Sequence, residues 1–374
     1  MTHVPSVIAA LAVLPAAVAA QDIWKTTDPD HPWAFPADHW AHPAYQTEWW
    51  YFTGHLTTTD AEARRIGYQF TFFRVGIVPE RPSLASDWAT ASLIMGHFAL
   101  TDLDAGRHGF SEILYRPTTF LGGFGDPGDS LIAWSVAPAG TGGVWTLRWN
   151  GDRFDLAARD DTRGITLELS ARPTKPLVFH GPGGYSRKGT RPGAASLYYS
   201  FTRLATAGVV TMGGERLGVR GESWMDHEFG SNQLTETQRG WDWFSLRLDD
   251  GRDLMIYVLR DRNGRPDFAL GTLVAPDGTA RGLTPEEWTL RATGAWTSDA
   301  TGARYPSGWT IRVPGAALAL LVTPEIRAQE NVSDLIPGLF YWEGAVLVHD
   351  DAGQAVGRGY VELTGYGTAR RPAI

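Results

Sequence analysis

The chain has 374 residues, a net charge of −8, no cysteine, 43 glycines, 23 prolines and 16 tryptophans. The missing cysteines exclude disulfides, cysteine-based zinc sites and thiol nucleophiles, and the acidic balance without a basic cluster argues against a nucleic-acid partner. A chain of this length accommodates about two domains of ~150 residues each, and its many turn-forming and aromatic residues, without a long apolar period of 3.6 residues, predict an all-β fold.

The first 20 residues have the character of an export signal. Val7–Ala20 is an apolar run with a single proline, and it is shorter than the ~20 residues that a membrane span needs. Small residues at positions 17–20 fit a cleavage site, although no Lys or Arg precedes Lys25 to supply the usual positive start. We expect residues 1–20 to be a signal peptide and the protein to be periplasmic or secreted without a stable membrane span; a buried apolar arm is the alternative.

Residues 21–45 predict an extended N-terminal arm, because they are rich in Pro, Trp and His and show no periodicity. His31, His39 and His42 lie in this arm, and clustered histidines can indicate a metal site. The arm offers no regular scaffold to aim them, and two of the three precede proline. We interpret them as structural or surface histidines and expect no metal and no cofactor.

Nearly alternating, aromatic-rich segments between turn residues predict antiparallel strands from residue 46 onward. The clearest are two predicted hairpins, Glu48–Leu56 with Ile66–Arg74 and Trp241–Leu248 with Asp253–Arg260. Strands at a spacing of about 8–12 residues are typical of barrels and sandwiches.

The two hairpins resemble each other, since each opens on aromatic residues and closes on an arginine, Arg74 or Arg260. This similarity favours a duplicated unit over chance, and we expect two tandem antiparallel β-barrels, at residues 46–224 and 225–374, packed together. A barrel of roughly eight strands can enclose one small ligand.

The stretch Gly221–Leu248 contains most of the candidate catalytic residues. It contains the three tryptophans Trp224, Trp241 and Trp243, the run Asp226-His227-Glu228 and a separate acid, Asp242. In a strand, Asp226 and Glu228 share one face and His227 takes the other. A carboxylic acid beside indole rings is desolvated, which raises its pKa and leaves a proton available near neutral pH. These acids, with Glu48, are therefore candidates for general acid catalysis.

Two other interpretations of these side chains remain open. In the first, Asp226 and His227 join the two barrels by hydrogen bonds, and Glu48 pairs with Arg74. In the second, the Asp-His-Glu run binds a metal together with His97 and Glu48, although no spacing in the sequence supports that ligand set.

The remaining acids and motifs add little. Glu343 and Glu362 are expected at strand ends, in ion pairs with Arg74 and Arg260. The sequence has no G-x-S-x-G elbow, no Walker loop and no G-x-G-x-x-G followed by a helix, so neither an α/β-hydrolase nor a nucleotide-binding fold is indicated.

Several segments resemble those of a known family, both in their amino-acid sequences and in their order along the chain. They are HPAYQTEWWYFTGHL from His42, GESWMDHEFGS from Gly221, GWDWFSLRLDDGRDLMIYVLR from Gly240, and YWEGAVLV followed by GYVELTGY up to Tyr366. Together they resemble the carotenoid 1,2-hydratase (hydroxyneurosporene synthase) and lipocalin-like family, which includes exported bacterial proteins labelled as secreted hydrolases. The resemblance implies two tandem lipocalin-like (calycin-like) antiparallel β-barrels.

The hydratases of that family add water to a terminal C=C bond of an acyclic carotenoid without a cofactor. An acid protonates the alkene, and water captures the tertiary cation. On this chain, His227 matches the family's histidine, and Tyr257 matches a tyrosine of the following strand. The hydratase pattern has an acid two residues further on, where this chain has Leu259. The catalytic acid would then be Asp226, Glu228 or Asp242.

We therefore expect a cofactor-free enzyme of the hydratase or isomerase type acting on a hydrophobic small molecule. A non-catalytic carrier of an apolar ligand, or a secreted hydrolase, is the alternative. The expected catalytic residues are Asp226, His227, Glu228, Asp242 and Tyr257. The expected ligand-binding residues are Glu48, Trp50, Tyr51, His97, Trp224, Trp241 and Trp243. The sequence carries no signal for an oligomeric state.

Overall fold

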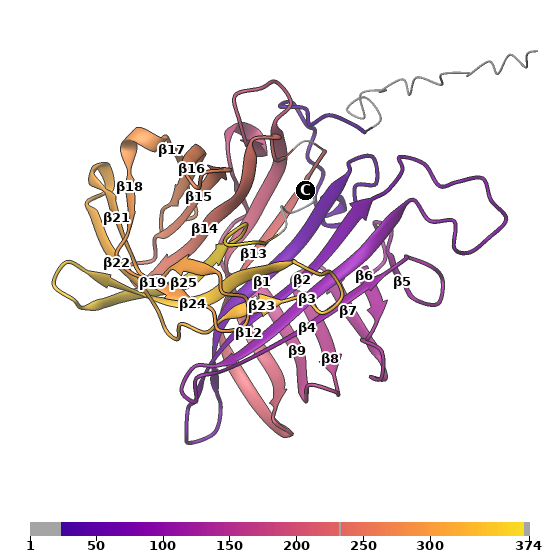
Figure 1. Cartoon of the computed structure of the whole chain (residues 1–374), viewed down its shortest axis with the longest axis horizontal. Helices are drawn as coiled ribbons and strands as arrows, with labels where there is room; N and C mark the ends of the chain where they lie inside the picture. Colours follow the sequence, from indigo (N-terminus) through magenta and orange to yellow (C-terminus); the bar gives the residue numbers. More distant parts are fainter. Residues whose placement is uncertain (1–23, 232, 370–374) are drawn as a thin grey trace, which may run out of the picture.

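The structure is a computed structural model that describes residues 24–231 and 233–369. Two large antiparallel sheets make up most of it and lie side by side (Figure 1). The expected signal peptide, residues 1–20, lies outside the described residues.

The larger sheet has 13 strands and is formed by the N-terminal part of the chain. Its strands are neighbours in the order β4-β3-β2-β1-β13-β12-β9-β8-β7-β6-β5, and the short β10 and β11 pair with β12. The sheet curls into a nearly closed barrel (Figure 1), and near its two ends the Tyr115 hydroxyl donates to the Ala137 carbonyl oxygen at 3.2 Å. The strands are β1 Thr47–Thr58, β2 Arg65–Gly76, β3 Ser92–Asp102, β4 Arg107–Tyr115, β5 Gly122–Phe124, β6 Leu131–Val136, β7 Val144–Trp149, β8 Phe154–Asp160, β9 Ile165–Pro173, β10 Val178–Phe179, β11 Tyr185–Arg187, β12 Ala195–Met212 and β13 Glu215–Gly230.

The second sheet has 10 strands and forms a half-barrel. Its order is β17-β16-β15-β14-β25-β24-β22-β21-β18, with β23 paired to β24, and β19 and β20 form a separate two-stranded sheet. The strands are β14 Gln238–Leu248, β15 Asp253–Asp261, β16 Pro266–Val274, β17 Ala280–Leu283, β18 Thr289–Ala292, β19 Ala295–Thr297, β20 Arg304–Pro306, β21 Trp309–Val313, β22 Leu318–Pro324, β23 Glu330–Val332, β24 Phe340–Asp350 and β25 Ala355–Leu363. The short 3-10 helices are η2 Ala37–His39, η3 Pro182–Gly184, η4 Pro285–Glu287 and η5 Pro314–Ala316.

Each sheet encloses an apolar core, and a third cluster of rings lies between the sheets. Because side chains alternate along a strand, β1 sends Trp50 into the first core and Tyr51 to the other side. There Tyr51 meets Trp243 of β14, with ring centroids 5.2 Å apart and nearly perpendicular planes. The outer faces of β1, β2 and β12 lie against β25, β24 and β14. Strands in this region are thus buried on both faces, which explains their unbroken aromatic sequences.

The predicted all-β fold with two lipocalin-like units is confirmed, and the second unit is the less closed one. Both predicted hairpins form, with Glu48 opposite Arg74 and Arg247 opposite Asp253. The expected domain boundary between residues 224 and 225 falls inside β13, which pairs with β1 and β12 throughout the first sheet. The strands of the first unit therefore continue to Gly230.

The N-terminal arm packs against the first barrel. The Trp40 indole donates to the Leu131 carbonyl oxygen at 2.8 Å, and the Trp50 indole donates to the His39 carbonyl oxygen, also at 2.8 Å. The described part of the arm, residues 24–45, contains turns and the short helix η2, and it is held by buried aromatic side chains such as Trp40 and Tyr45.

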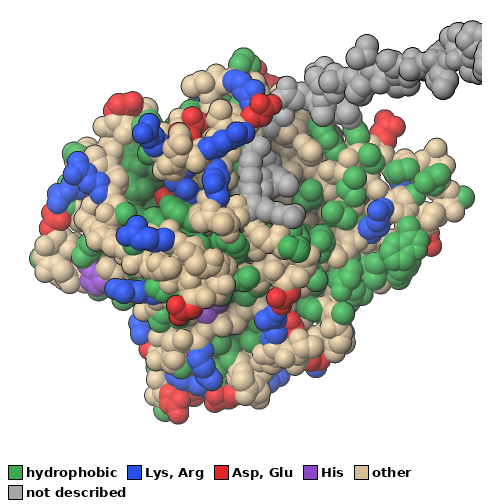
Figure 2. All heavy atoms as spheres, viewed as in Figure 1, with side chains coloured by type: hydrophobic (Ala, Val, Ile, Leu, Met, Phe, Trp, Pro, Cys, Tyr) green, Lys and Arg blue, Asp and Glu red, His purple; other side chains and the backbone are tan. Residues whose placement is uncertain are grey.

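The surface is mixed in character. Charged side chains are scattered over both units, whereas apolar side chains gather over the first sheet, on the right of Figure 2. The loops that follow β2 and β4 expose Ile77, Leu84, Trp88 and Phe120. In the described part of the chain, no helix has the length and apolar character needed to cross a membrane.

Candidate functional site

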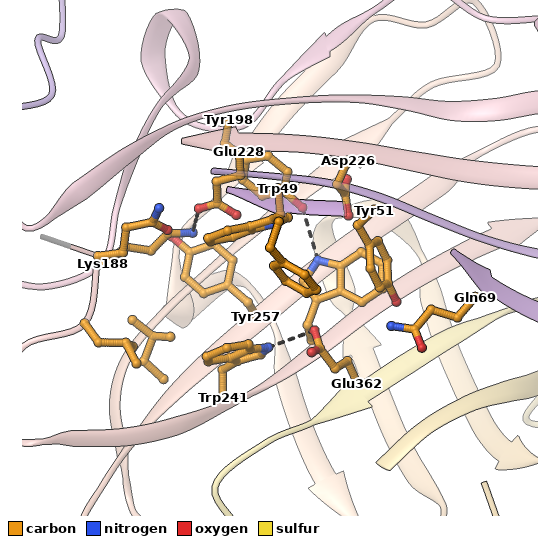
Figure 3. Close-up of a pocket in the computed structure, with 15 residues that line it drawn as sticks. Trp49, Tyr51, Gln69, Lys188, Tyr198, Asp226, Glu228, Trp241, Tyr257 and Glu362 are labelled. Atoms are coloured by element: carbon orange, nitrogen blue, oxygen red, sulfur yellow. Dashed lines mark hydrogen bonds and ion pairs between the residues drawn. The ribbon is translucent and has the colours of Figure 1, made fainter. Parts of the chain in front are cut away.

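A cavity lies between the two sheets, where the third ring cluster leaves a gap (Figure 3). The space that can hold the centre of a water molecule is about 80 Å³, and the whole void, including the part open to solvent, is about 720 Å³. Its apolar walls are Trp49, Tyr51, Phe73, Tyr198, Leu234, Trp241, Trp243, Tyr257 and Leu259, and its polar groups are Gln69, Lys188, Asp226, Glu228, Gln233 and Glu362. A mostly aromatic cavity with a few convergent polar groups is the usual form of a small-molecule site.

The register of β13 against β1 places two acids on the cavity side. Asp226 lies opposite Tyr51, and Glu228 lies opposite Trp49. His227, between the acids, points to the other side of the strand, into the first barrel. The alternation expected from the sequence thus holds here, and β13 presents both carboxylates to the cavity.

Asp226 is the more strongly perturbed of these two acids. Its side chain is 3% exposed, and burial raises the pKa of the carboxyl to about 7, with a smaller contribution from the charge of Glu228. Hydrogen bonds from the Ser200 hydroxyl and from the Trp224 indole, the latter 2.7 Å long, oppose this shift. Asp226 therefore keeps a proton near neutral pH beside aromatic rings.

Glu228 sits in an ion pair. The Lys188 ammonium lies 2.6 Å from its carboxylate and 4.2 Å from the centroid of the Tyr257 ring, and the Ser196 hydroxyl also donates to it. Burial is the largest single influence and lowers the pKa of Lys188, but the charge and hydrogen bond of Glu228, together with Tyr257 and Asp226, outweigh it and raise that pKa. The two cavity acids thus differ: Asp226 retains a proton, whereas Glu228 has a cationic partner.

A third acid, Glu362 of β25, lies across the cavity from these two (Figure 3). The Trp241 indole donates to its carboxylate at 2.9 Å, and burial raises the pKa of Glu362 to about 7. The expected pairing of Glu362 with Arg74 or Arg260 is wrong. Glu362 lies opposite Trp243 in the pairing of β25 with β14, and the two arginines pair with Glu48 and Asp242.

The expected arginine partner of Glu343 is wrong as well. The Tyr51 hydroxyl donates to Glu343 at 2.6 Å, and Glu343 stands directly opposite Glu362 in the sheet. Burial, with the neighbouring Glu362 adding to it, raises the pKa of Glu343 far above its usual value. Tyr51 therefore links the cavity wall to a second buried acid.

The other expected acid, Asp242, is held apart from the cavity. The Arg260 guanidinium lies 2.8 Å from its carboxylate, and the Tyr366 hydroxyl donates to it at 2.9 Å. Burial raises the pKa of Asp242, and the charge of Arg260 opposes that shift. Asp242 thus has a complete set of structural partners.

Glu48 and His227 belong to a buried network inside the first barrel. Glu48 accepts from Arg74 at 3.1 Å, as the ion-pair interpretation predicted, and lies 2.9 Å from His227 Nε2. His227 Nδ1 lies 2.9 Å from the Tyr199 hydroxyl, and Trp50 stacks on the His227 ring. Neither Glu48, Trp50 nor His227 lines the cavity.

The remaining expected residues divide between the cavity and its surroundings. Tyr51, Trp241, Trp243 and Tyr257 line it, whereas Trp224 supports Asp226 from beside it. Tyr257 directs its hydroxyl to the Arg187 carbonyl oxygen. His97 lies outside the lining, 2.7 Å from the Tyr341 hydroxyl.

Sequence reasoning missed Lys188 and Glu362. Lys188 follows β11 in a Gly- and Pro-rich segment that predicted only a loop, and the pairing of β11 with β12 brings it to the site. Glu362 shares its strand face with Tyr360, so the aromatic residue two positions earlier was the available signal.

Two groups of described side chains have the spacing of metal ligands, and both lie away from the cavity. One is His31, Asp38 and His42, and the other is His42, Glu48 and His227. The cavity itself can instead hold an apolar molecule among rings, with a protonated acid directed at it.

Comparisons with known proteins agree with this architecture. Residues 26–366 match the AttH-like family. The crystal structure of an AttH candidate from Nitrosomonas europaea has a TM-score of 0.79 and 31% identity, covering 92% of this chain and 100% of that one.

Two more distant structures share the fold. Kievitone hydratase from Nectria haematococca has a TM-score of 0.64 and 14% identity, covering 92% of this chain and 96% of that one. CghA in complex with Sch210972 has a TM-score of 0.50 and 12% identity, with 88% and 90% covered. No curated protein sequence matches the chain. Because the family match extends over residues 26–366, the chain belongs to the AttH-like family.

Proposed function

We propose that the protein is a cofactor-free acid catalyst, of the carotenoid 1,2-hydratase type, that hydrates or isomerises an alkene in a hydrophobic small molecule. The observation that carries this proposal is the Asp226 carboxyl, which faces an aromatic cavity with a pKa raised to about 7. A general acid works best when its pKa lies near the operating pH.

The proposed reaction needs only the side chains of the cavity. Asp226 gives its proton to one alkene carbon, so that a C–H bond forms as the π bond breaks and the other carbon becomes a cation. Aromatic rings of the lining, such as Trp243 and Tyr198, can stabilise such a cation through cation–π contacts. Water then adds to the cation, and the proton that it releases returns to Asp226. The sum is alkene plus water to alcohol; in an isomerisation, the cation instead returns a proton from a neighbouring carbon.

The cavity is large enough for only one end of a hydrophobic substrate. Ligand pockets usually measure about 300–1,000 Å³, and only the void that includes its open part, about 720 Å³, falls in that range. We propose that the reacting alkene end, such as a branched isoprenoid terminus, enters between the rings while the rest of the molecule extends toward solvent. The name of kievitone hydratase, a protein of the same fold, agrees with hydration as the chemistry.

A carrier of an apolar ligand is the second candidate, since the cavity is mostly aromatic. A buried carboxyl with a raised pKa, such as Asp226, favours an enzyme over a carrier. Burying a carboxyl costs free energy, and binding of an apolar ligand does not require one. A hydrolase has less support, since no Ser or Thr is among the described residues that line the cavity.

Extraction of apolar molecules from the purified protein, followed by mass spectrometry, separates the first two candidates. We expect wild-type protein and the control Asp242→Asn to carry a hydrated or isomerised product, and Asp226→Asn to carry its alkene precursor. The same unmodified molecule in all three proteins would favour the carrier.

We further propose that the protein is exported, on the strength of the apolar run Val7–Ala20 and the small residues that end it. N-terminal sequencing of protein recovered from the periplasm or medium tests this. A start close to residue 21 supports export, and recovery of the intact N-terminus from the cytoplasm contradicts it.

A further inference from the structure

Three side chains of the N-terminal arm converge on one point beside the first barrel. His42 Nε2 lies 3.2 Å from one carboxylate oxygen of Asp38, and His31 Nε2 lies 3.9 Å from the other. All the facing nitrogen and oxygen atoms of this arm cluster lie within 4.8 Å of one another. Two imidazoles and one carboxylate form a donor set that first-row divalent metals accept.

His31 is the member that protein contacts leave unsatisfied. Its side chain is only 9% exposed, yet neither ring nitrogen has a hydrogen-bond partner among the described residues. The ring packs edge-on against Trp33, with centroids 4.7 Å apart, and against Phe229 at 5.7 Å. Buried polar groups are nearly always paired, so this imidazole indicates a missing partner that accepts a nitrogen lone pair.

His42 is oriented as a metal-binding histidine is. Its Nδ1 lies 2.7 Å from Glu48, and Glu48 is completely buried and held by Arg74 at 3.1 Å. The contact with Glu48 leaves Nε2 directed at Asp38 and toward His31. A carboxylate behind the second ring nitrogen is the usual support of a ligating histidine, because it fixes the ring and the tautomer.

The neighbouring group of His42, Glu48 and His227 does not call for an ion. Glu48 already has contacts with the His42 backbone N–H at 2.8 Å, with both imidazoles and with Arg74. Its carboxylate is therefore satisfied, and a cation there would face the buried guanidinium.

We infer that His31, Asp38 and His42 form a binding site for one divalent transition-metal ion, with Zn²⁺ the best fit. Bonds of about 2.0–2.2 Å from zinc to nitrogen and oxygen place tetrahedral ligand atoms roughly 3.5 Å apart, so a small closure of the observed spacing completes the site. Zinc suits two imidazoles and a carboxylate and leaves a fourth position for water. The Asp38 and His42 side chains are 13% and 15% exposed, which gives the ion a path from solvent.

The site would act as a brace for the arm. It joins the two ends of the segment 31–42 to each other, and through Glu48 and His227 it reaches the face of β13 opposite Asp226. Binding of the ion therefore stabilises the arm independently of any reaction in the cavity.

The test uses the full purified chain, stripped with a chelator and titrated with Zn²⁺ by calorimetry, with metal content measured by mass spectrometry. We expect one ion per chain and a higher melting temperature with Zn²⁺, and visible absorption of a low-symmetry Co²⁺ site when cobalt replaces zinc. The variant His31→Ala removes no side-chain hydrogen bond among the described residues and should fold. It should weaken binding by more than the roughly 10–100-fold that loss of a supporting residue costs.

The matched control is His349→Ala, which removes a histidine of β24 far along the chain from the arm and should bind Zn²⁺ as the wild type does. The inference is overturned if the stripped chain takes up no Zn²⁺. It is also overturned if His31→Ala binds Zn²⁺ with unchanged affinity. If, in addition, His227→Gln abolishes binding, the ion is bound by His42, Glu48 and His227 instead.

Discussion

Replacing Asp226 with Asn should change how the stability of the protein depends on pH. Folding raises the pKa of this carboxyl from 3.8 to about 7, a shift of about 3 units, and each unit is worth ~1.36 kcal/mol, or roughly 4 kcal/mol in all. Below pH 4 both states hold the proton and Asp226 has no effect. Between pH 4 and 7 the unfolded chain ionises while the folded protein does not, so stability is lost as pH rises.

Urea unfolding at several pH values measures this effect. The free energy of unfolding of Asp226→Asn, relative to wild type, should rise by about 4 kcal/mol between pH 4 and pH 8. Asp277→Asn is the matched control, since Asp277 is exposed and its pKa is lowered, and it should show no such rise. A difference between Asp226→Asn and wild type that stays constant over this range refutes the argument that Asp226 is the protonated cavity acid.

Three further substitutions separate catalysis from structure. Asp242→Asn leaves Arg260 buried without its counter-charge, which lies 2.8 Å away in the wild type. The free energy of unfolding in urea should therefore fall by about 3–5 kcal/mol, while the bound molecules stay the same. A fall of less than about 1 kcal/mol contradicts this reasoning. Tyr257→Phe should keep turnover within roughly tenfold of wild type, since its hydroxyl bonds to the backbone, while Asp226→Asn loses the ~10²–10⁴-fold that a general acid supplies; equal losses would place Tyr257 in the chemistry. His227→Ala should cost about 1–3 kcal/mol of stability by leaving its buried partners unpaired, and turnover per folded molecule should persist; its disappearance would return His227 to the mechanism.

Much of the fold could be predicted from local patterns. The alternation around Asp226 and Glu228 placed both acids on one face of a strand, and the pairing of Glu48 with Arg74 was one of the two interpretations of Glu48. These features depend on strand geometry alone, which has a period of two residues. The degree of closure of each barrel depends on how many strands pair and curl, and no local pattern expresses it.

The contents of the cavity were harder to predict, because they come from distant strands. Glu362 meets Trp241 across β14 and β25, a separation of more than a hundred residues, and Lys188 reaches Glu228 from an irregular loop. Ion-pair reasoning assigned arginines to Glu343 and Glu362, but the register sets these two acids opposite each other, facing the other sheet. Charge counting cannot reveal which face a strand turns inward.

The placement of the histidines in the N-terminal arm could not be predicted from the sequence either. His31 and His42 lie on chain without regular periodicity, so the sequence offered no geometry to bring them together. The short turn of η2 and the packing of Trp33 on Phe229 supply it.

Turnover in water enriched in ¹⁸O shows whether Asp226 protonates an alkene held between the two sheets. Purified protein is incubated with a panel of acyclic isoprenoid alkenes, and the products are identified by mass spectrometry. Wild-type protein and Asp242→Asn should form either an alcohol with one ¹⁸O atom, by hydration, or a shifted alkene without ¹⁸O, by isomerisation, and Asp226→Asn should form neither. Formation of either product by Asp226→Asn at the wild-type rate would contradict this role of Asp226.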